Sequence, residues 1–249
     1  MLSKSQISLV SSLQHKKFRR QHHLFIAEGL KSVVEFTQSG YDTEAIYYTP
    51  QFAPKLLNLS KKINTQEISE AELKRITALK TPSGVLALIR IPATQDINYN
   101  LLRNKFSIVL DGVQDPGNMG TIIRTADWFG IQHIICSEDT VDVYNPKVVQ
   151  ATMGSLSRVN IHYTDLNKLL PALKLPVFGA LLDGTNIYQT SFGTEGLVLM
   201  GNEGNGIRPE ILPLISTSVT IPQAGKAESL NVAIATAIFC SEISRNTLK

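Results

Sequence analysis

The chain of 249 residues lacks several features that would point to other classes of protein. It has two cysteines and five histidines, and their positions show no zinc-ligand spacing. No apolar run approaches the ~20 residues of a membrane-spanning helix, and the N-terminal residues lack the apolar block of a signal peptide. We therefore expect a cytoplasmic protein with no metal and no membrane association, whose Cys136 and Cys240 are reduced, although a disulfide between them stays an alternative.

Two nucleotide-binding signatures are also absent from the sequence. No stretch matches G-x-x-x-x-G-K-[ST], and the glycines at strand-to-helix turns do not match G-x-G-x-x-G. These absences disfavour P-loop nucleotidases, Rossmann oxidoreductases and Rossmann-type methyltransferases. A regulator that binds nucleotides through glycine loops stays an alternative, and the missing P-loop lysine argues against it.

The charges are divided unevenly along the chain. Residues 1–95 hold 13 of the 24 basic and 7 of the 21 acidic residues, a net charge of +6, and the remainder has a net charge of −3. Residues 15–23, HKKFRRQHH, combine four cations, three histidines and one aromatic ring. This composition is typical of an RNA-backbone contact, and equally of a solvated loop. On the first reading, RNA phosphates are contacted by Lys16, Lys17, Arg19 and Arg20.

The periodicity predicts two α/β domains joined by a linker at residues 96–104. Residues 1–95 alternate short helices and strands, which predicts a small domain with a mixed or parallel sheet. Residues 105–249 alternate strands with helices, which predicts a parallel sheet covered on both faces. Specific elements expected are a helix over 69–78 with a capping box of Ser69 and Glu72, helices over 51–59, 119–129, 208–214 and 230–244, and strands over 106–110 and 157–161.

Three polar loops each follow a predicted strand, at residues 111–124, 199–207 and 221–233. In open α/β sheets, ligands bind beyond the carboxyl ends of the strands. Glycine allows the backbone to approach a ligand closely, and Asn, Glu, Ser and Arg supply directional polar groups. Each loop alone could be an ordinary turn, but together the three loops predict one binding site.

The loops resemble the three signature motifs of the SpoU family of RNA ribose 2′-O-methyltransferases, within the SPOUT superfamily. DPGNMG at 115–120, continued by Arg124-Thr125-Ala126, is similar to the first motif, and GNEG at 201–204 to the second. Ile221-Pro222 and SLNVA at 229–233 are similar to the third. Residues 145–155 also match, and the N-terminal third more weakly resembles the family's substrate-binding domain.

This resemblance implies an N-terminal RNA-binding domain and a SPOUT-type catalytic domain whose C-terminus forms a trefoil knot. It implies S-adenosylmethionine as cofactor, a homodimer, and RNA as substrate, with ribosomal RNA favoured over transfer RNA and no DNA partner. A transfer RNA methyltransferase and an inactive RNA-binding scaffold are the alternatives. By carry-over, catalytic or positioning roles fall to Asn118, Arg124, Glu203, Ser229 and Asn231. Cofactor contacts fall to Leu181, Gly201, Asn202, Gly206, Ile221 and Leu230.

The chemistry of these side chains narrows their expected roles. Arginine is a poor general base because its pKa lies above ~12, so we expect Arg124 to stabilise the developing oxyanion. Glu203 is expected to orient either loop backbone N–H groups or Arg124, and Ser229 either binds substrate or caps the last helix. Trp128 is expected in the core or in a dimer interface. Helices 119–129 and 230–244 are apolar on more than one face, so we expect them to pack across a two-fold axis that brings Arg124 to the partner's site.

Overall fold

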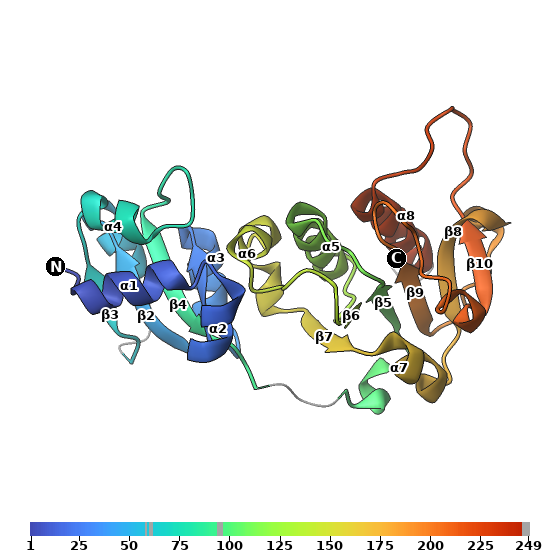
Figure 1. The fold of residues 1–249 in the computed structure, drawn as a ribbon, viewed down its shortest axis with the longest axis horizontal. Coiled ribbons are helices and arrows are strands. Elements are labelled where there is room, and N and C mark those ends of the chain that lie inside the picture. The colour runs from blue at the N-terminus through green and yellow to red at the C-terminus, as the bar shows by residue number, and fades with distance from the viewer. Residues whose placement is uncertain (58, 60–61, 94–96, 246–249) are drawn as a thin grey trace. The chain divides into compact units, whose positions relative to one another are not determined.

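The computed structural model describes residues 1–57, 59, 62–93 and 97–245. It contains two compact units (Figure 1). Unit 1 consists of residues 1–95 together with 142–157, and unit 2 of residues 96–141 together with 158–249. The chain therefore passes between the two units three times. Residue 96 of the predicted linker lies outside the described residues.

Unit 1 is built on a mixed four-stranded sheet, which is one of the two forms the sequence predicts. Its order is β1 (Leu24–Glu28), β4 (Val85–Arg90), β2 (Thr43–Tyr48), β3 (Thr65–Glu67). Strand β4 runs antiparallel to β1 and β2, and β3 runs parallel to β2. The helical segments are α1 (Lys4–Ser12), α2 (Lys16–His22), α3 (Leu30–Thr37), η1 (Pro50–Leu56), α4 (Glu70–Ile76), α6 (Pro146–Thr152) and η3 (Ser155–Ser157).

Local sequence explains the helix boundaries of unit 1. The predicted capping box is confirmed, because Ser69 accepts from the Glu72 N–H and Glu72 accepts from the Ser69 N–H. The helix predicted over 51–59 is found as the 3-10 helix Pro50–Leu56, because the internal Pro54 has no N–H to continue an α-helix. Residue 58 of that prediction lies outside the described residues. The basic segment is a helix, α2, and not a loop.

Unit 2 contains a six-stranded sheet in which every neighbouring pair is parallel, as the sequence predicts. The order is β10 (Thr217–Thr220), β8 (Val177–Asn186), β9 (Gly196–Met200), β5 (Phe106–Leu110), β6 (His133–Ser137), β7 (Asn160–Thr164). The helical segments are η2 (Tyr99–Leu102), α5 (Pro116–Trp128), α7 (Leu166–Leu173), η4 (Ile187–Gln189), η5 (Leu212–Leu214) and α8 (Val232–Ser244). Because all strands point the same way, their carboxyl ends lie along one edge.

Two predicted elements of unit 2 differ from the structure. Of residues 208–214, only Leu212–Leu214 are helical, as the 3-10 helix η5, because Pro213 lacks the N–H that an α-helix requires there. The strand predicted over 157–161 is Asn160–Thr164, since Ser155–Ser157 form η3. The trefoil knot stays a prediction from the resemblance.

Residues 142–157 pack within unit 1, although the predicted boundary at residue 105 assigns them to the second domain. The ring of Tyr144 lies 4.8 Å from that of Phe25, between centroids. The guanidinium of Arg19 lies 2.6 Å from the Asp142 carboxylate. Aromatic packing and a shielded ion pair thus hold this segment against the N-terminal sheet.

Candidate functional site

The first two polar loops start side by side because their strands are neighbours. Leu110, the last residue of β5, pairs with Met200, the last residue of β9. The Asp111 N–H donates to the Met200 carbonyl at 2.9 Å, which continues the pairing by one step. Strand β5 is buried from Ser107 to Leu110, so the point at which the first loop leaves the sheet is fixed by the core.

A chain of side-chain hydrogen bonds joins all three loops. Asn231 donates from Nδ2 to Asn118 Oδ1 at 2.9 Å, and Asn118 donates from Nδ2 to Glu203 Oε1 at 3.0 Å. The Glu203 carboxylate also accepts from the backbone N–H groups of Gln114 and Asp115, each at 3.1 Å. The structure therefore brings together three of the five residues to which the resemblance assigns catalytic or positioning roles.

Two helix N-termini are fixed at this edge of the sheet. Asp115 caps α5 by accepting from the Asn118 N–H at 2.8 Å, and Pro116 occupies the first helical position, where no N–H is needed. Asn231 caps α8 by accepting from the Ala233 N–H at 2.9 Å. Asn231 thus orients its amide with one end on its own helix and the other on Asn118.

Glu203 is held as a carboxylate by its donors. Partial burial raises the pKa of Glu203, but the hydrogen bonds from Asn118 and from backbone N–H groups outweigh this and leave the pKa below 4.5. A carboxyl group in this state accepts hydrogen bonds and does not donate a proton near neutral pH. The expected orienting role of Glu203 agrees with this arrangement.

The second loop folds back on itself as a tight turn. Asn202 and Gly206 exchange two backbone hydrogen bonds, at 2.9 and 3.0 Å, and Gly206 has φ +69°. A Cβ atom at Gly201 would lie 2.3 Å from the carbonyl carbon of Gly206. Asn202 donates to the Gly112 carbonyl at 2.6 Å, which ties this turn to the first loop. Gly201 and Asn202, assigned to cofactor contact, therefore also shape the loop itself.

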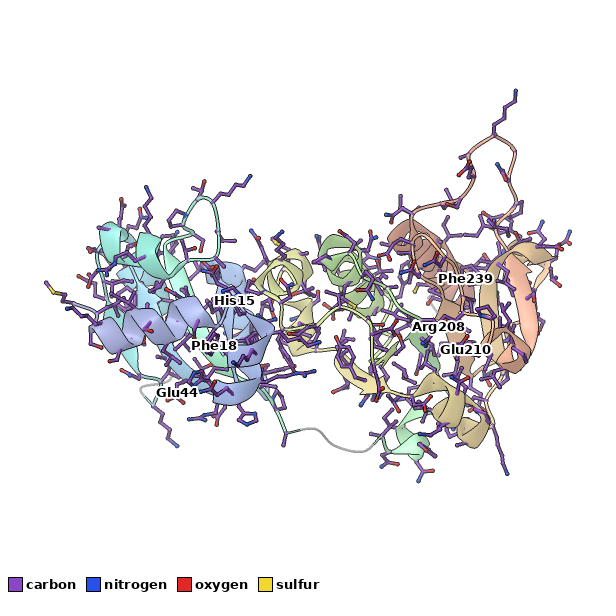
Figure 2. All side chains as sticks on the ribbon, viewed as in Figure 1. His15, Phe18, Glu44, Arg208, Glu210 and Phe239 are labelled. Carbon is purple, nitrogen blue, oxygen red and sulfur yellow. The ribbon has the colours of Figure 1, made fainter. Side chains whose placement is uncertain are left out.

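Sequence reasoning missed one pair that anchors the two loops. Asp111 is fully buried, and Arg208, which is labelled in Figure 2, donates to it from the backbone N–H at 2.8 Å and from Nε at 2.7 Å. Hydrogen bonding to Asp111, only partly offset by burial, raises the pKa of Arg208. An aspartate directly after a buried apolar strand was the signal available, because a carboxylate there needs a cationic partner.

The remaining predicted residues take no part in the hydrogen-bond network that joins the three loops. Arg124 lies on the exposed side of α5, and among the described residues it takes part in no hydrogen bond or ion pair given by the structure. Ser229 and Leu230 are exposed in the loop between β10 and α8, which projects beyond both elements in Figure 1. Leu181 is half-buried against the core, and Ile221 is half-buried at the start of that loop.

Trp128 does not lie in the core. Its side chain is 83% exposed, near the C-terminal end of α5. The opposite side of the helix supplies the buried residues Ile122, Ile123 and Ala126. The expectation of core packing for Trp128 is therefore wrong, and the dimer interface stays a prediction.

The four residues of unit 1 that were predicted to contact phosphate differ in their exposure to solvent. Lys16, Lys17 and Arg20 are exposed on α2. Arg19 is 2% exposed, and its guanidinium donates to the carbonyls of Leu13 and Gln14 as well as to Asp142. Because Arg19 is enclosed and its guanidinium is already bonded within unit 1, we withdraw it from the proposed RNA contact.

Together, the parallel sheet and its linked strand-end loops define an α/β domain with a candidate ligand site at the carboxyl edge. Residues 105–241 match the family model described as the SpoU rRNA Methylase family, and residues 4–87 match the MRM3-like substrate binding domain. The chain belongs to the SpoU rRNA Methylase family, which confirms the resemblance drawn from its motifs.

Individual relatives extend this result over the whole chain. The chain is 31% identical to the 23S rRNA (guanosine(2553)-2'-O)-methyltransferase RlmP of Bacillus subtilis, over 91% of both proteins. An AdoMet-bound rRNA methyltransferase from Sinorhizobium meliloti shares 31% identity at a TM-score of 0.86, covering 100% of this chain and 98% of that one. The TrmH/SpoU tRNA modifying enzyme of A. aeolicus shares 25% identity at a TM-score of 0.50, covering 59% and 79%.

Proposed function

We propose that this protein transfers a methyl group from S-adenosylmethionine to a ribose 2′-hydroxyl of ribosomal RNA. The observation that carries the proposal is the chain from Asn231 through Asn118 to Glu203, which joins three motif loops at one edge of the sheet. Membership of the family and the names of relatives that match the full length support it. The tRNA-modifying relative aligns with 59% of this chain, which favours ribosomal RNA.

The residues at the sheet edge fit S-adenosylmethionine in chemical character. The second loop is exposed at Gly204 and Gly206, and open space lies beside Gly206, where a Cβ would meet nothing within 4 Å. Leu181, within β8, and Ile221, directly after β10, offer apolar surface. The bound cofactor supplies an electrophilic methyl group. We propose that these residues, with Gly201, Asn202 and Leu230, hold it.

The remaining motif residues act on the RNA. A ribose hydroxyl is a weak nucleophile until its developing negative charge is stabilised. Arg124, free of partners within the described chain, is available to stabilise that charge and the adjacent phosphate. Asn118 and Asn231 fix the directions of hydrogen-bond donors and acceptors, while Glu203 holds the loop backbone in place. Ser229 is exposed in the loop that precedes α8, two residues before Asn231, and is available to contact the substrate.

Transfer of a labelled methyl group from S-adenosylmethionine to RNA tests the activity. Ribosomal and transfer RNA from a strain lacking this gene serve as competing substrates, and Arg124→Ala is the control for motif-dependent transfer. Label in ribosomal RNA at a ribose supports the proposal. Label in transfer RNA supports the alternative substrate, and RNA binding without label supports an inactive scaffold.

We also propose that the protein works as a homodimer through the α5–α8 face of unit 2. An open groove of about 440 Å³ lies there, lined by residues that include Thr121, Tyr188, Ile234 and Ile238. Tyr188 and Ile234 are 57% and 54% exposed, and exposed apolar surface of this kind is typical of an interface. A two-fold contact would place Arg124 of one protomer near the loops of its partner.

A cytoplasmic location is proposed on the state of the cysteines. Cys136 and Cys240 are both buried free thiols. Burial raises the pKa of the Cys240 thiol to about 12, so this group is unreactive at neutral pH. Among the described residues, no helix is long and apolar enough to span a membrane.

A further inference from the structure

Helix α2 carries an aromatic face that phosphate binding does not explain. His15, Phe18 and His22 recur at helical spacing, and the ring of Phe18 pairs with the rings of both histidines. His15 and Phe18 are labelled in Figure 2. The rings of Phe18 and His22 lie 19° from parallel with centroids 6.4 Å apart. His15 is exposed, and Phe18 and His22 are half-buried, so the face reaches solvent. We call these three residues the aromatic face.

The buried Arg19 fixes which way this face points. Its guanidinium is bonded to Leu13, Gln14 and Asp142, so α2 cannot rotate without breaking these bonds. At about 100° per residue, this orientation places the aromatic face on one side of Arg19, and Lys16 and Arg20 on the other. The two kinds of side chain are therefore presented as two adjacent stripes.

A cationic side chain also lies beside the aromatic face. The Lys17 ammonium lies 5.9 Å from the centroid of the Phe18 ring, within the range of a cation–π contact. Single-stranded nucleic acid is bound by this combination, because bases stack on aromatic rings while cations contact the backbone. In a base-paired duplex the bases are stacked on one another, so their faces are not available.

We propose that α2 binds unpaired nucleotides of the substrate, an inference that rests on the proposed action on RNA. The aromatic face stacks on bases, and Lys16, Lys17 and Arg20 contact the phosphates. The substrate class is thus narrowed to RNA that carries an unpaired segment. A purely electrostatic surface would bind duplex and single strands through phosphates alone.

The test compares a labelled oligouridine of about 12 nucleotides, long enough for one stacking site, with an RNA duplex of equal length. Full-length protein is titrated by fluorescence anisotropy over a series of salt concentrations. Phe18→Leu keeps an apolar side chain and removes the π-system. We expect single-strand affinity to fall roughly 5- to 150-fold, the loss typical of one stacked base, with duplex affinity and salt slope unchanged.

Matched variants complete the comparison. Tyr99→Leu removes an exposed aromatic residue from unit 2 and is expected to change neither affinity. The triple variant Lys16→Gln, Lys17→Gln and Arg20→Gln should weaken both RNAs and reduce the single-strand salt slope by about 2. Equal losses for both RNAs with Phe18→Leu, or no loss, would overturn the proposal.

A second variant keeps the test decisive if Phe18→Leu does not fold. F18W in a W128F background retains a stacking ring and provides the chain's single tryptophan signal. We expect this fluorescence to be quenched by the oligouridine, and absence of quenching overturns the proposal. Affinity for S-adenosylmethionine and methyl transfer are measured in parallel. If the wild-type protein binds oligouridine but transfers no methyl group, the result contradicts the proposed function and does not contradict the stacking proposal.

Discussion

Asp111 and Arg208 are 97 residues apart in sequence, yet the carboxylate of one accepts two hydrogen bonds from the other, at 2.7 and 2.8 Å. Asp111 stands at the start of the first motif loop and Arg208 directly after the second. The pair therefore fixes the spacing between the loops that carry Asn118 and Glu203. Arg208 is 37% exposed and Asp111 fully buried, so loss of the arginine would leave an enclosed, unpaired charge.

We predict that Arg208→Ala destabilises unit 2. Breaking a fully buried pair costs ~3–5 kcal/mol, and partial exposure of Arg208 reduces this to about 2 kcal/mol. The free energy of unfolding in urea measures the effect. Lys168→Ala is the matched control, because its ion pair with Asp165 is exposed and contributes at most about 1 kcal/mol. Equal effects of the two variants would contradict the anchoring role of Arg208.

We predict that Glu203→Gln slows methyl transfer by about 10- to 100-fold, because loss of its bonds to loop backbone shifts the catalytic groups. Stability should depend on pH as well. The folded-state pKa of Glu203 is below 4.5, so its stabilisation is present above pH 4.5 and is lost as the pH falls through the folded-state pKa. The difference in unfolding free energy between wild type and variant should therefore shrink in acid.

Urea unfolding between pH 7 and pH 3 measures this difference, with Glu138→Gln as a control at an exposed carboxylate beyond β6. A difference that does not change with pH would show that Glu203 is not a stabilised carboxylate.

The stacked pair of His133 and His162 predicts a second pH effect at higher pH. Their ring nitrogens lie 3.2 Å apart, and burial, His162 and Lys105 lower the pKa of His133 to about 4. The unfolded chain binds protons first, so stability declines as the pH falls from 6.5 towards 4. We expect a loss of roughly 2 kcal/mol after allowance for screening, and His133→Gln should flatten the decline in urea unfolding. An unchanged slope would contradict it.

Arg124→Ala is predicted to lower the rate of methyl transfer by about 10²–10³, the typical loss of one charge-stabilising donor, with unchanged affinity for S-adenosylmethionine. A mixed dimer of this variant with Glu203→Ala tests whether Arg124 acts across the interface. If it does, one site carries both lesions and the other is intact, so part of the activity returns. No recovery would place Arg124 in its own chain's site.

Glu203, and not a glycine of the second loop, is changed in the mixed dimer for a structural reason. A side chain at Gly201 would collide with the backbone of Gly206 and Ile207 within the same loop. A bulky Gly201 variant would therefore disrupt the loop, and its loss of cofactor binding would not locate the cofactor.

We predict that Ile234→Glu weakens the dimer by at least about tenfold, because a charge would be buried in the apolar face. Sedimentation measures the association, and the fluorescence of Trp128, the single tryptophan, reports its exposure. Leu57→Glu changes an exposed leucine of unit 1, 80% exposed, and should leave association unchanged. A wild-type protein that sediments as a monomer would contradict the dimer.

The sequence predicted the parallel sheet and the contact among its loops because both depend on local patterns. Strands with buried apolar runs were followed by Gly- and Asn-rich loops, and Asn118, Glu203 and Asn231 do lie together. The environment of a charged side chain depends on distant partners instead. Arg19 is enclosed because Asp142, 123 residues away, packs beside it, and no local pattern distinguishes it from the exposed Arg20.

Trp128 shows the converse error. A tryptophan near the end of an apolar helix was expected in the core or in a dimer interface; helical rotation places it opposite Ile122 and Ala126, which contradicts the core and leaves the interface a prediction. The type of the short helices η1 and η5 could not be predicted for a related reason. A proline favours a 3-10 helix over an α-helix only where its missing N–H would have been needed, and the sequence does not show which hydrogen bonds form.

The packing of residues 142–157 within unit 1 has an evolutionary consequence. Recombination between genes exchanges domains readily when one junction separates them, but here a junction near residue 100 would also separate Tyr144 from Phe25 and Asp142 from Arg19. A transplanted C-terminal half would carry this segment without the strand and helix that it covers. Exchange of the N-terminal domain among relatives is therefore expected to require matching changes in residues 142–157. We expect the N-terminal domain and this segment to evolve together.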